Sequence, residues 1–137
     1  MAEAEMEFTV PVSADEVKSR IRDMGFVGRC FKFVGDVSRD GRIWRVKAPM
    51  SAITQTKELE TRVLSQDPIE WEAEGKHLLW RGVFEVEESE EGTKIKVRLS
   101  VEGLGSMAPI INPMAGMQIE GQLRYFAKKL REELSRT

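Results

Sequence analysis

Few side chains in this sequence have the types and spacing that enzymatic chemistry requires. The chain has one histidine, His77, and one cysteine, Cys30. His77 lies at an expected turn and has no carboxylate, serine or cysteine at a spacing typical of a catalytic pair. A lone cysteine between Arg29 and Phe31 is more often a small core residue than a nucleophile. The sequence therefore predicts no catalytic residue, no metal site and no internal disulfide.

Two polar residues are candidates for a ligand site. Gln55 and Lys57 share the face of an expected strand with Ile53, Leu59 and Val63, which are predicted to point inward. A buried lysine has a lowered pKa and can act as a nucleophile or orient a ligand carbonyl. A bulge in the strand would instead turn both side chains outward. These two residues are the basis for a hypothesis of a cyclase- or hydrolase-like enzyme.

The segment Gly103-Leu-Gly-Ser-Met-Ala108 matches the pattern G-x-G-x-x-A between a strand and a helix, as in a dinucleotide-binding turn. Its context argues against that function. The preceding strand alternates with Lys and Arg, unlike a buried parallel strand, and Pro109 and Pro113 interrupt the following helical pattern. No later strand completes a βαβ unit. We interpret the glycines as a hinge and predict no cofactor.

The strongest case for a binding site comes from apolar residues. Large aromatic residues occupy expected inward positions of the strands, and the segment before the last helix is rich in Met and Pro. Methionine suits an adaptable binding surface, and an apolar cleft is the usual small-molecule site. Small residues at other inward positions indicate a partly empty interior: Ala48, Ala73, Gly75 and Gly82. The predicted pocket is lined by Trp44, Trp71, Trp80, Phe84, Met107, Ile110, Met114 and Met117. The alternative is that these side chains simply fill the core.

A sheet must position the aromatic residues. Alternating apolar and charged residues predict a first strand that ends at Pro11, and Asp40-Gly41 predicts the turn of a hairpin. Further strands are predicted over Ala52–Leu64, Ile69–Gly75, Leu78–Val86 and Ile95–Val101. Between the first strand and the hairpin, Ser13-Ala-Asp-Glu16 matches a capping box. It predicts a short helix with Val17, Ile21 and Met24 on one face, and Phe26–Phe33 is a second short helix or turn.

The last predicted element is a long helix from Gly116 to Leu134. Its apolar residues recur at steps of three and four: Ile119, Leu123, Phe126, Ala127, Leu130 and Leu134. Before it, the Met-rich segment from Met107 to Met117 is predicted to be a separate, hinged lid. A sheet needs a partner for its apolar face, and this helix is the only large candidate. The predicted fold class is therefore α+β, with a curved antiparallel sheet of about six to seven strands around a long C-terminal helix.

Composition limits the class of protein. A chain of 137 residues with 41% hydrophobic and 32% charged residues is predicted to form a single globular domain, 1–137. The net charge of −2 argues against a nucleic-acid binder. No apolar run is long enough for membrane insertion, and the start Met-Ala-Glu-Ala-Glu is unlike a signal peptide. We therefore expect a cytoplasmic protein.

Several short motifs carry a family resemblance: Phe8-Thr-Val-Pro-Val-Ser-Ala-Asp-Glu-Val17, Val46-Lys-Ala-Pro49, Asp67-Pro68 before a Trp strand, Glu74-Gly75-Lys76 and Gly92-Thr-Lys-Ile95. With the order of elements, they resemble the helix-grip (SRPBCC) superfamily of START lipid-transfer domains, pollen-allergen-type proteins and polyketide cyclases. Within it, the sequence is most similar to the carbon monoxide dehydrogenase G-subunit family.

The resemblance implies a helix-grip fold and a pocket between the sheet and the last helix for a lipid, a quinone or another apolar molecule. It also implies a protein partner, because the protein that gives the family its name is linked to maturation or membrane recruitment of a molybdenum hydroxylase. Longer members carry a C-terminal extension that can anchor them to the membrane, whereas this sequence ends at Ser135-Arg136-Thr137. Three hypotheses follow: an apolar-ligand binder, a protein-contact accessory factor with a vestigial pocket, or an enzyme.

Overall fold

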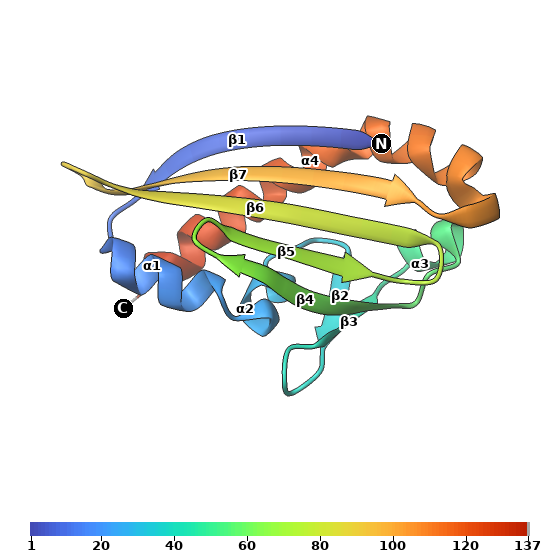
Figure 1. Ribbon diagram of the computed structural model, residues 1–137, viewed down its shortest axis with the longest axis horizontal. Coiled ribbons are helices and arrows are strands. Elements are labelled where there is room, and N and C mark those ends of the chain that lie inside the picture. Colours follow the sequence, from blue (N-terminus) through green and yellow to red (C-terminus); the bar gives the residue numbers. More distant parts are fainter. Residues whose placement is uncertain (137) are drawn as a thin grey trace.

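A seven-stranded antiparallel sheet curls around one long helix in the computed structural model, which describes residues 1–136 (Figure 1). The strands lie in the spatial order β1-β7-β6-β5-β4-β3-β2. Their bounds are β1 (Ala2–Val10), β2 (Val34–Val37), β3 (Ile43–Val46), β4 (Glu58–Gln66), β5 (Ile69–Glu74), β6 (Leu78–Ser89) and β7 (Gly92–Gly103). The helices are α1 (Ala14–Ile21), α2 (Met24–Arg29), α3 (Met50–Thr54), the 3₁₀ turn η1 (Gly105–Met107) and α4 (Ala108–Leu134). The predicted α+β helix-grip fold is confirmed. Thr137, the last residue of the predicted domain, lies outside the described residues.

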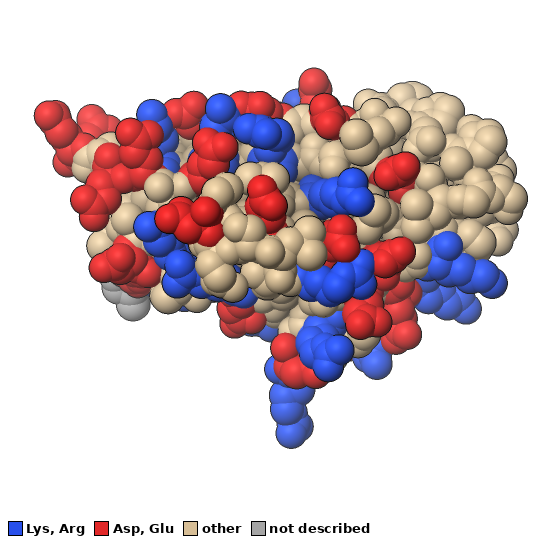
Figure 2. Space-filling model, viewed as in Figure 1, with Lys and Arg blue, Asp and Glu red and all other residues tan. Residues whose placement is uncertain are grey.

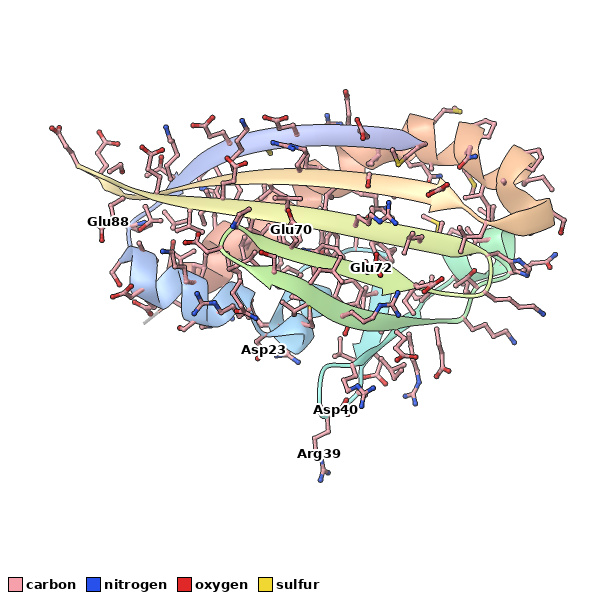
Figure 3. All side chains as sticks on the ribbon, viewed as in Figure 1. Asp23, Arg39, Asp40, Glu70, Glu72 and Glu88 are labelled. Atoms are coloured by element: carbon pink, nitrogen blue, oxygen red, sulfur yellow. The ribbon has the colours of Figure 1, made fainter. Side chains whose placement is uncertain are left out.

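The outer face of the sheet is covered by ion pairs between neighbouring strands (Figures 2 and 3). Arg62 on β4 lies 2.7 Å from the carboxylates of Glu72 and Glu74 on β5, and Arg81 on β6 contacts Glu72 from the other side. The hydrogen bonds of Arg62 hold the pKa of the Glu72 carboxyl below its usual value. The charged residues that alternate with apolar ones along each strand therefore face solvent, and the apolar ones face α4.

The boundary between the two short helices after β1 differs from the prediction. The Ser13 hydroxyl accepts a hydrogen bond from the Glu16 amide, which confirms this side of the predicted cap. However, α1 ends at Ile21, and Met24 begins α2 instead of extending the first helix. The Asp23 carboxylate caps α2 by accepting from the Gly25 amide at 2.9 Å. The prediction missed this second cap because the apolar spacing continues across the break.

The strand predicted over Ala52–Leu64 begins later than expected. Its first part forms α3, in which the Thr54 hydroxyl donates to the Met50 carbonyl at 2.9 Å. Gln55 then adopts a left-handed conformation, with φ of 56°, before β4 begins at Glu58. Local hydrogen bonds thus override a weak alternating pattern. This difference changes which residues of the segment face inward.

Helix α4 is continuous over 27 residues and includes most of the segment predicted to be a separate lid. Pro109 lies in its first turn, where the backbone has no intrahelical acceptor for an amide hydrogen. Pro113 lies inside the helix and removes one hydrogen bond without ending it. The prediction of a break was wrong, because Pro109 falls where the helix tolerates proline and the helix continues through Pro113 despite the lost hydrogen bond. No helix within residues 1–136 is long and apolar enough to cross a membrane.

Aromatic side chains fill the space between the middle of the sheet and the second half of α4. We call residues 108–118 the first half of this helix and residues 119–134 the second half. The Phe31 ring stacks on Phe126 of α4 with centroids 4.2 Å apart, and Phe84 of β6 stacks on the same ring at 5.9 Å. The small inward residues do not leave this region empty, contrary to the prediction. A Cβ atom on Gly82 would collide with the indole of Trp71, so the glycine makes room for that ring. This part of the interior is a packed core.

Candidate functional site

An apolar crevice lies between the sheet, α3 and the first half of α4. Its walls include Leu78 and Trp80 of β6, Val101 of β7, and Ile111 and Met114 of α4. The enclosed free volume is about 20 Å³, which is room for about one water molecule. The crevice is therefore nearly closed, and any larger molecule has to widen it.

A larger open cleft lies beside this crevice, between α3 and α4. It has a volume of about 640 Å³, and Ile53 of α3 and Met117 of α4 lie along it. The side chains of Met50, Gln118 and Gln122 line both the cleft and the crevice. These three residues thus separate the enclosed space from the solvent.

Two buried polar atoms of crevice-lining residues have no hydrogen-bond partner among residues 1–136. They are the indole Nε1 of Trp80 and the amide Oε1 of Gln122. In the core, the Trp44 indole donates to the Met24 carbonyl at 2.8 Å, whereas the Trp71 indole Nε1 also has no partner among residues 1–136. An unpaired buried polar group costs about 1–3 kcal/mol. A hydroxyl group can accept from an indole N–H and donate to an amide oxygen, so it has the chemistry that each of these atoms lacks.

The structure brings together only some of the predicted pocket residues. Trp80 and Met114 line the crevice, and Met117 lines the open cleft. Met107 packs partly against the core, whereas the Ile110 side chain is exposed on the outer side of α4. The remaining predicted residues belong to the packed core and line neither space: Trp44, Trp71 and Phe84.

Gln55 and Lys57, the predicted polar groups of the pocket, are both exposed and line neither the crevice nor the cleft. The strand parity that placed them inward does not apply, because α3 and the left-handed Gln55 precede β4. Sequence reasoning missed Gln122 and Met50. Gln122 is three residues after Ile119 on α4, so helical spacing could have identified it. Met50 carried no such signal because α3 was not predicted.

The remaining reactive side chains, Cys30 and His77, lie outside both the crevice and the cleft. Burial, together with the nearby Glu133 carboxylate, raises the pKa of the Cys30 thiol to about 12. The His77 carbonyl accepts from the Leu104 amide at 2.9 Å, so His77 lies at a structural turn as predicted. Within residues 1–136, no cluster of three or more His, Cys, Asp or Glu could hold a metal ion.

Solved structures of other proteins share this architecture. A START superfamily protein from Mycobacterium smegmatis has a TM-score of 0.66 at 17% identity, covering 98% of this chain and 97% of that one. A conserved protein from Geobacillus kaustophilus has a TM-score of 0.63 at 19% identity, covering 96% and 93%. The di-domain ARO/CYC protein StfQ of the steffimycin biosynthetic pathway has a TM-score of 0.63 at 12% identity, covering 96% and 49%. At these identities the likeness shows the fold alone.

No curated protein is significantly similar in sequence. The family model for polyketide cyclase / dehydrase and lipid transport matches residues 1–135, nearly the whole chain. The helix-grip superfamily expected from the sequence motifs is thereby confirmed at this broader level. The chain belongs to the polyketide cyclase / dehydrase and lipid transport family.

Proposed function

We propose that this protein binds an apolar small molecule, of lipid-like or quinone-like character, in the crevice beneath the first half of α4. The observation that carries the proposal is that the crevice lies directly beside the open cleft, with only Met50, Gln118 and Gln122 between them. An apolar space with a few polar atoms is the usual form of a small-molecule site. Family membership supports the same class of function.

The unpaired atoms of Trp80 and Gln122 support a ligand that carries one polar group, such as a hydroxyl. Burying that group against them would satisfy a donor and an acceptor that are otherwise unpaired. The apolar remainder of the ligand would contact Leu78, Val101 and Ile111. The site thus favours a hydroxylated apolar molecule over a pure hydrocarbon.

Ligand entry requires the first half of α4 to move away from the sheet. Ile110 and Met117 of this half are exposed, so an outward shift loses little of their packing. Gly105, just before the helix, has a φ of 61° and no atom within 4 Å of the position of a Cβ. Pro113 also removes one hydrogen bond from this part of the helix. We propose that residues 105–118 open as a lid that remains helical.

The test is a binding titration with 1-naphthol, followed by quenching of tryptophan fluorescence, alongside native mass spectrometry of the purified protein. The Ala115→Phe variant fills the crevice, because Ala115 is one of its lining residues. We expect it to weaken binding at least about tenfold, which corresponds to about 1.4 kcal/mol. Ile110→Phe is the matched control, on the exposed side of the same helix. Absence of both co-purifying lipophile and naphthol binding, or equal binding by both variants, would contradict the proposal.

A narrower proposal is an accessory role for a molybdenum hydroxylase, like that of the carbon monoxide dehydrogenase G-subunit family. Its support is the set of sequence motifs given above, and its test is co-purification of a molybdenum hydroxylase with the tagged protein. The enzyme hypothesis loses its support, because Gln55 and Lys57 are exposed and outside both spaces.

A further inference from the structure

The end of the molecule where α4 begins has an unusual charge. Three segments meet there: 47–57 between β3 and β4, 75–77 between β5 and β6, and 104–119, which includes η1 and the first half of α4. The strand register brings them together, because Leu78 pairs with Gly103 and Glu74 pairs with Leu79. None of the three segments contains an Asp or Glu. Glu120 follows the last segment directly and lines the open cleft. We call this surface the α4 end.

The turns at the opposite end of the sheet are acidic. Asp67 lies in the turn between β4 and β5, and Glu90 and Glu91 form the turn between β6 and β7. The α4 end instead carries Lys47 and Lys76, together with Lys57. Positive and negative groups are thus unevenly distributed between the two ends of a protein whose net charge is only −2.

The lysines of the α4 end differ from those of the sheet face. Lys47, Lys57 and Lys76 are exposed, and none of them forms an ion pair with any other residue of the chain from 1 to 136. On the sheet face, by contrast, Lys94 and Lys96 each pair with a glutamate of β1. The positive charge at the α4 end is therefore available to an anionic partner.

Large apolar side chains are exposed at the same end of the molecule. Met117 is 87% exposed, Ile110 is 57% exposed and Ile53 is 40% exposed. Ile110 and Met117 are seven residues apart on one helix, so they share one face. Figure 2 shows the result as a cap without charged residues over the start of α4, with basic side chains below it. Ile53 and Met117 also line the same cleft, and clustered exposed apolar side chains mark interaction sites.

We propose that the α4 end docks on an anionic lipid bilayer, with Ile53, Ile110 and Met117 entering the interface and the lysines contacting the head groups. Protruding apolar side chains beside basic ones are the features of a peripheral membrane-binding surface. A second copy of this chain is a poorer match, because it would place lysines against lysines. A protein partner is an alternative outcome of the test below, because it would not make binding depend on anionic lipid. The proposal does not rest on the proposed function.

The test is co-sedimentation of the full chain with two kinds of vesicle: pure phosphatidylcholine, and equal parts of phosphatidylcholine and phosphatidylglycerol. We expect binding to the anionic vesicles and at least about tenfold weaker binding to the neutral ones. Ile110→Glu and Met117→Glu should each abolish binding, because a carboxylate cannot enter the interface. Leu64→Glu is the matched control, since Leu64 is 55% exposed but lies on β4, away from the α4 end. It should bind as the unmodified protein does.

The lysines give an independent measurement. Each of Lys47→Gln, Lys57→Gln and Lys76→Gln should weaken binding to anionic vesicles about fivefold, because a basic residue near an anionic surface contributes about 1 kcal/mol. The proposal is overturned if the protein binds neutral and anionic vesicles equally well, or if Leu64→Glu weakens vesicle binding as much as Ile110→Glu does. It is also overturned if the protein forms a dimer in solution and Met117→Glu abolishes that dimer instead of vesicle binding. Naphthol titration without vesicles separates the two proposals, because it reports on the crevice alone.

Discussion

The two halves of α4 have opposite designs within one continuous helix. In the second half, a single apolar stripe is buried against the sheet, and the other faces are largely charged or polar. The stripe consists of Ile119, Leu123, Phe126, Ala127, Leu130 and Leu134. In the first half only Ile111 is fully buried, while Ile110 and Met117 point to solvent. The second half is anchored by aromatic stacking, and the first covers a crevice with unpaired polar atoms. The comparison suggests that stability and binding are assigned to different turns of the same helix.

The largest expected effect is on stability in the second half. Phe126→Ala removes the ring that stacks on Phe31 and Phe84. It should lower the free energy of unfolding by about 3–5 kcal/mol, as for other buried Phe residues. Met117→Ala, in the first half, should change it by less than about 0.5 kcal/mol. Urea unfolding followed by circular dichroism measures both values, and similar losses would show that the two halves are equally important for stability.

Thiol reactivity should also separate the two halves. Cys30 lies near Lys129 and Glu133 of the second half, and burial raises its pKa to about 12 from a usual value of 9.0. Because the thiolate is the reactive form, alkylation at pH near 8 should be about a thousandfold slower than for an ordinary thiol. Met117→Cys in a Cys30→Ala background should react at the ordinary rate. Rapid alkylation of Cys30 in the folded protein would mean that the packed end opens readily.

A smaller effect is expected where the halves meet. Gln122→Leu replaces a buried amide oxygen that has no partner among residues 1–136. It should raise the free energy of unfolding of the ligand-free protein by about 1 kcal/mol, because a buried polar atom without a hydrogen bond is removed. The same change should reduce any preference for 1-naphthol over 1-methylnaphthalene, which lacks the hydroxyl. Loss of stability without a change in this preference would indicate that Gln122 has a purely structural role.

The smallest effect concerns pH. Arg62 lowers the pKa of Glu72 in the folded protein, so Glu72 contributes stability above its unfolded pKa and loses it as pH falls through the folded value. Glu72→Gln should therefore flatten the acid side of the stability curve. Segment 104–119 contains no ionisable side chain, so opening of the lid, measured by hydrogen exchange corrected for intrinsic rates, should change less over the same range. Equal pH dependence would link the lid to the charged sheet face.

Sequence patterns predicted the fold better than the site. Alternation along the strands and the stripe from Ile119 to Leu134 depend on burial over many residues, so small local errors do not change the architecture. The site depends on a few local details instead. The short helix α3 changes the direction of Gln55 and Lys57, so neither points inward. The Trp71 indole fills the space beside Gly82. Periodicity cannot reveal either of these, because both depend on three-dimensional contacts.

The most direct test of the proposed site is the response of the three tryptophan indole N–H signals to 1-naphthol in a ¹⁵N-correlation NMR spectrum. The Trp80 indole belongs to a crevice residue and has no partner among residues 1–136, whereas the Trp44 indole donates to the Met24 carbonyl in the core. We predict a saturable shift of the Trp80 signal, with the Trp44 signal unchanged. An unmoved Trp80 signal, or equal shifts of all three signals, would contradict a ligand site beneath the first half of α4.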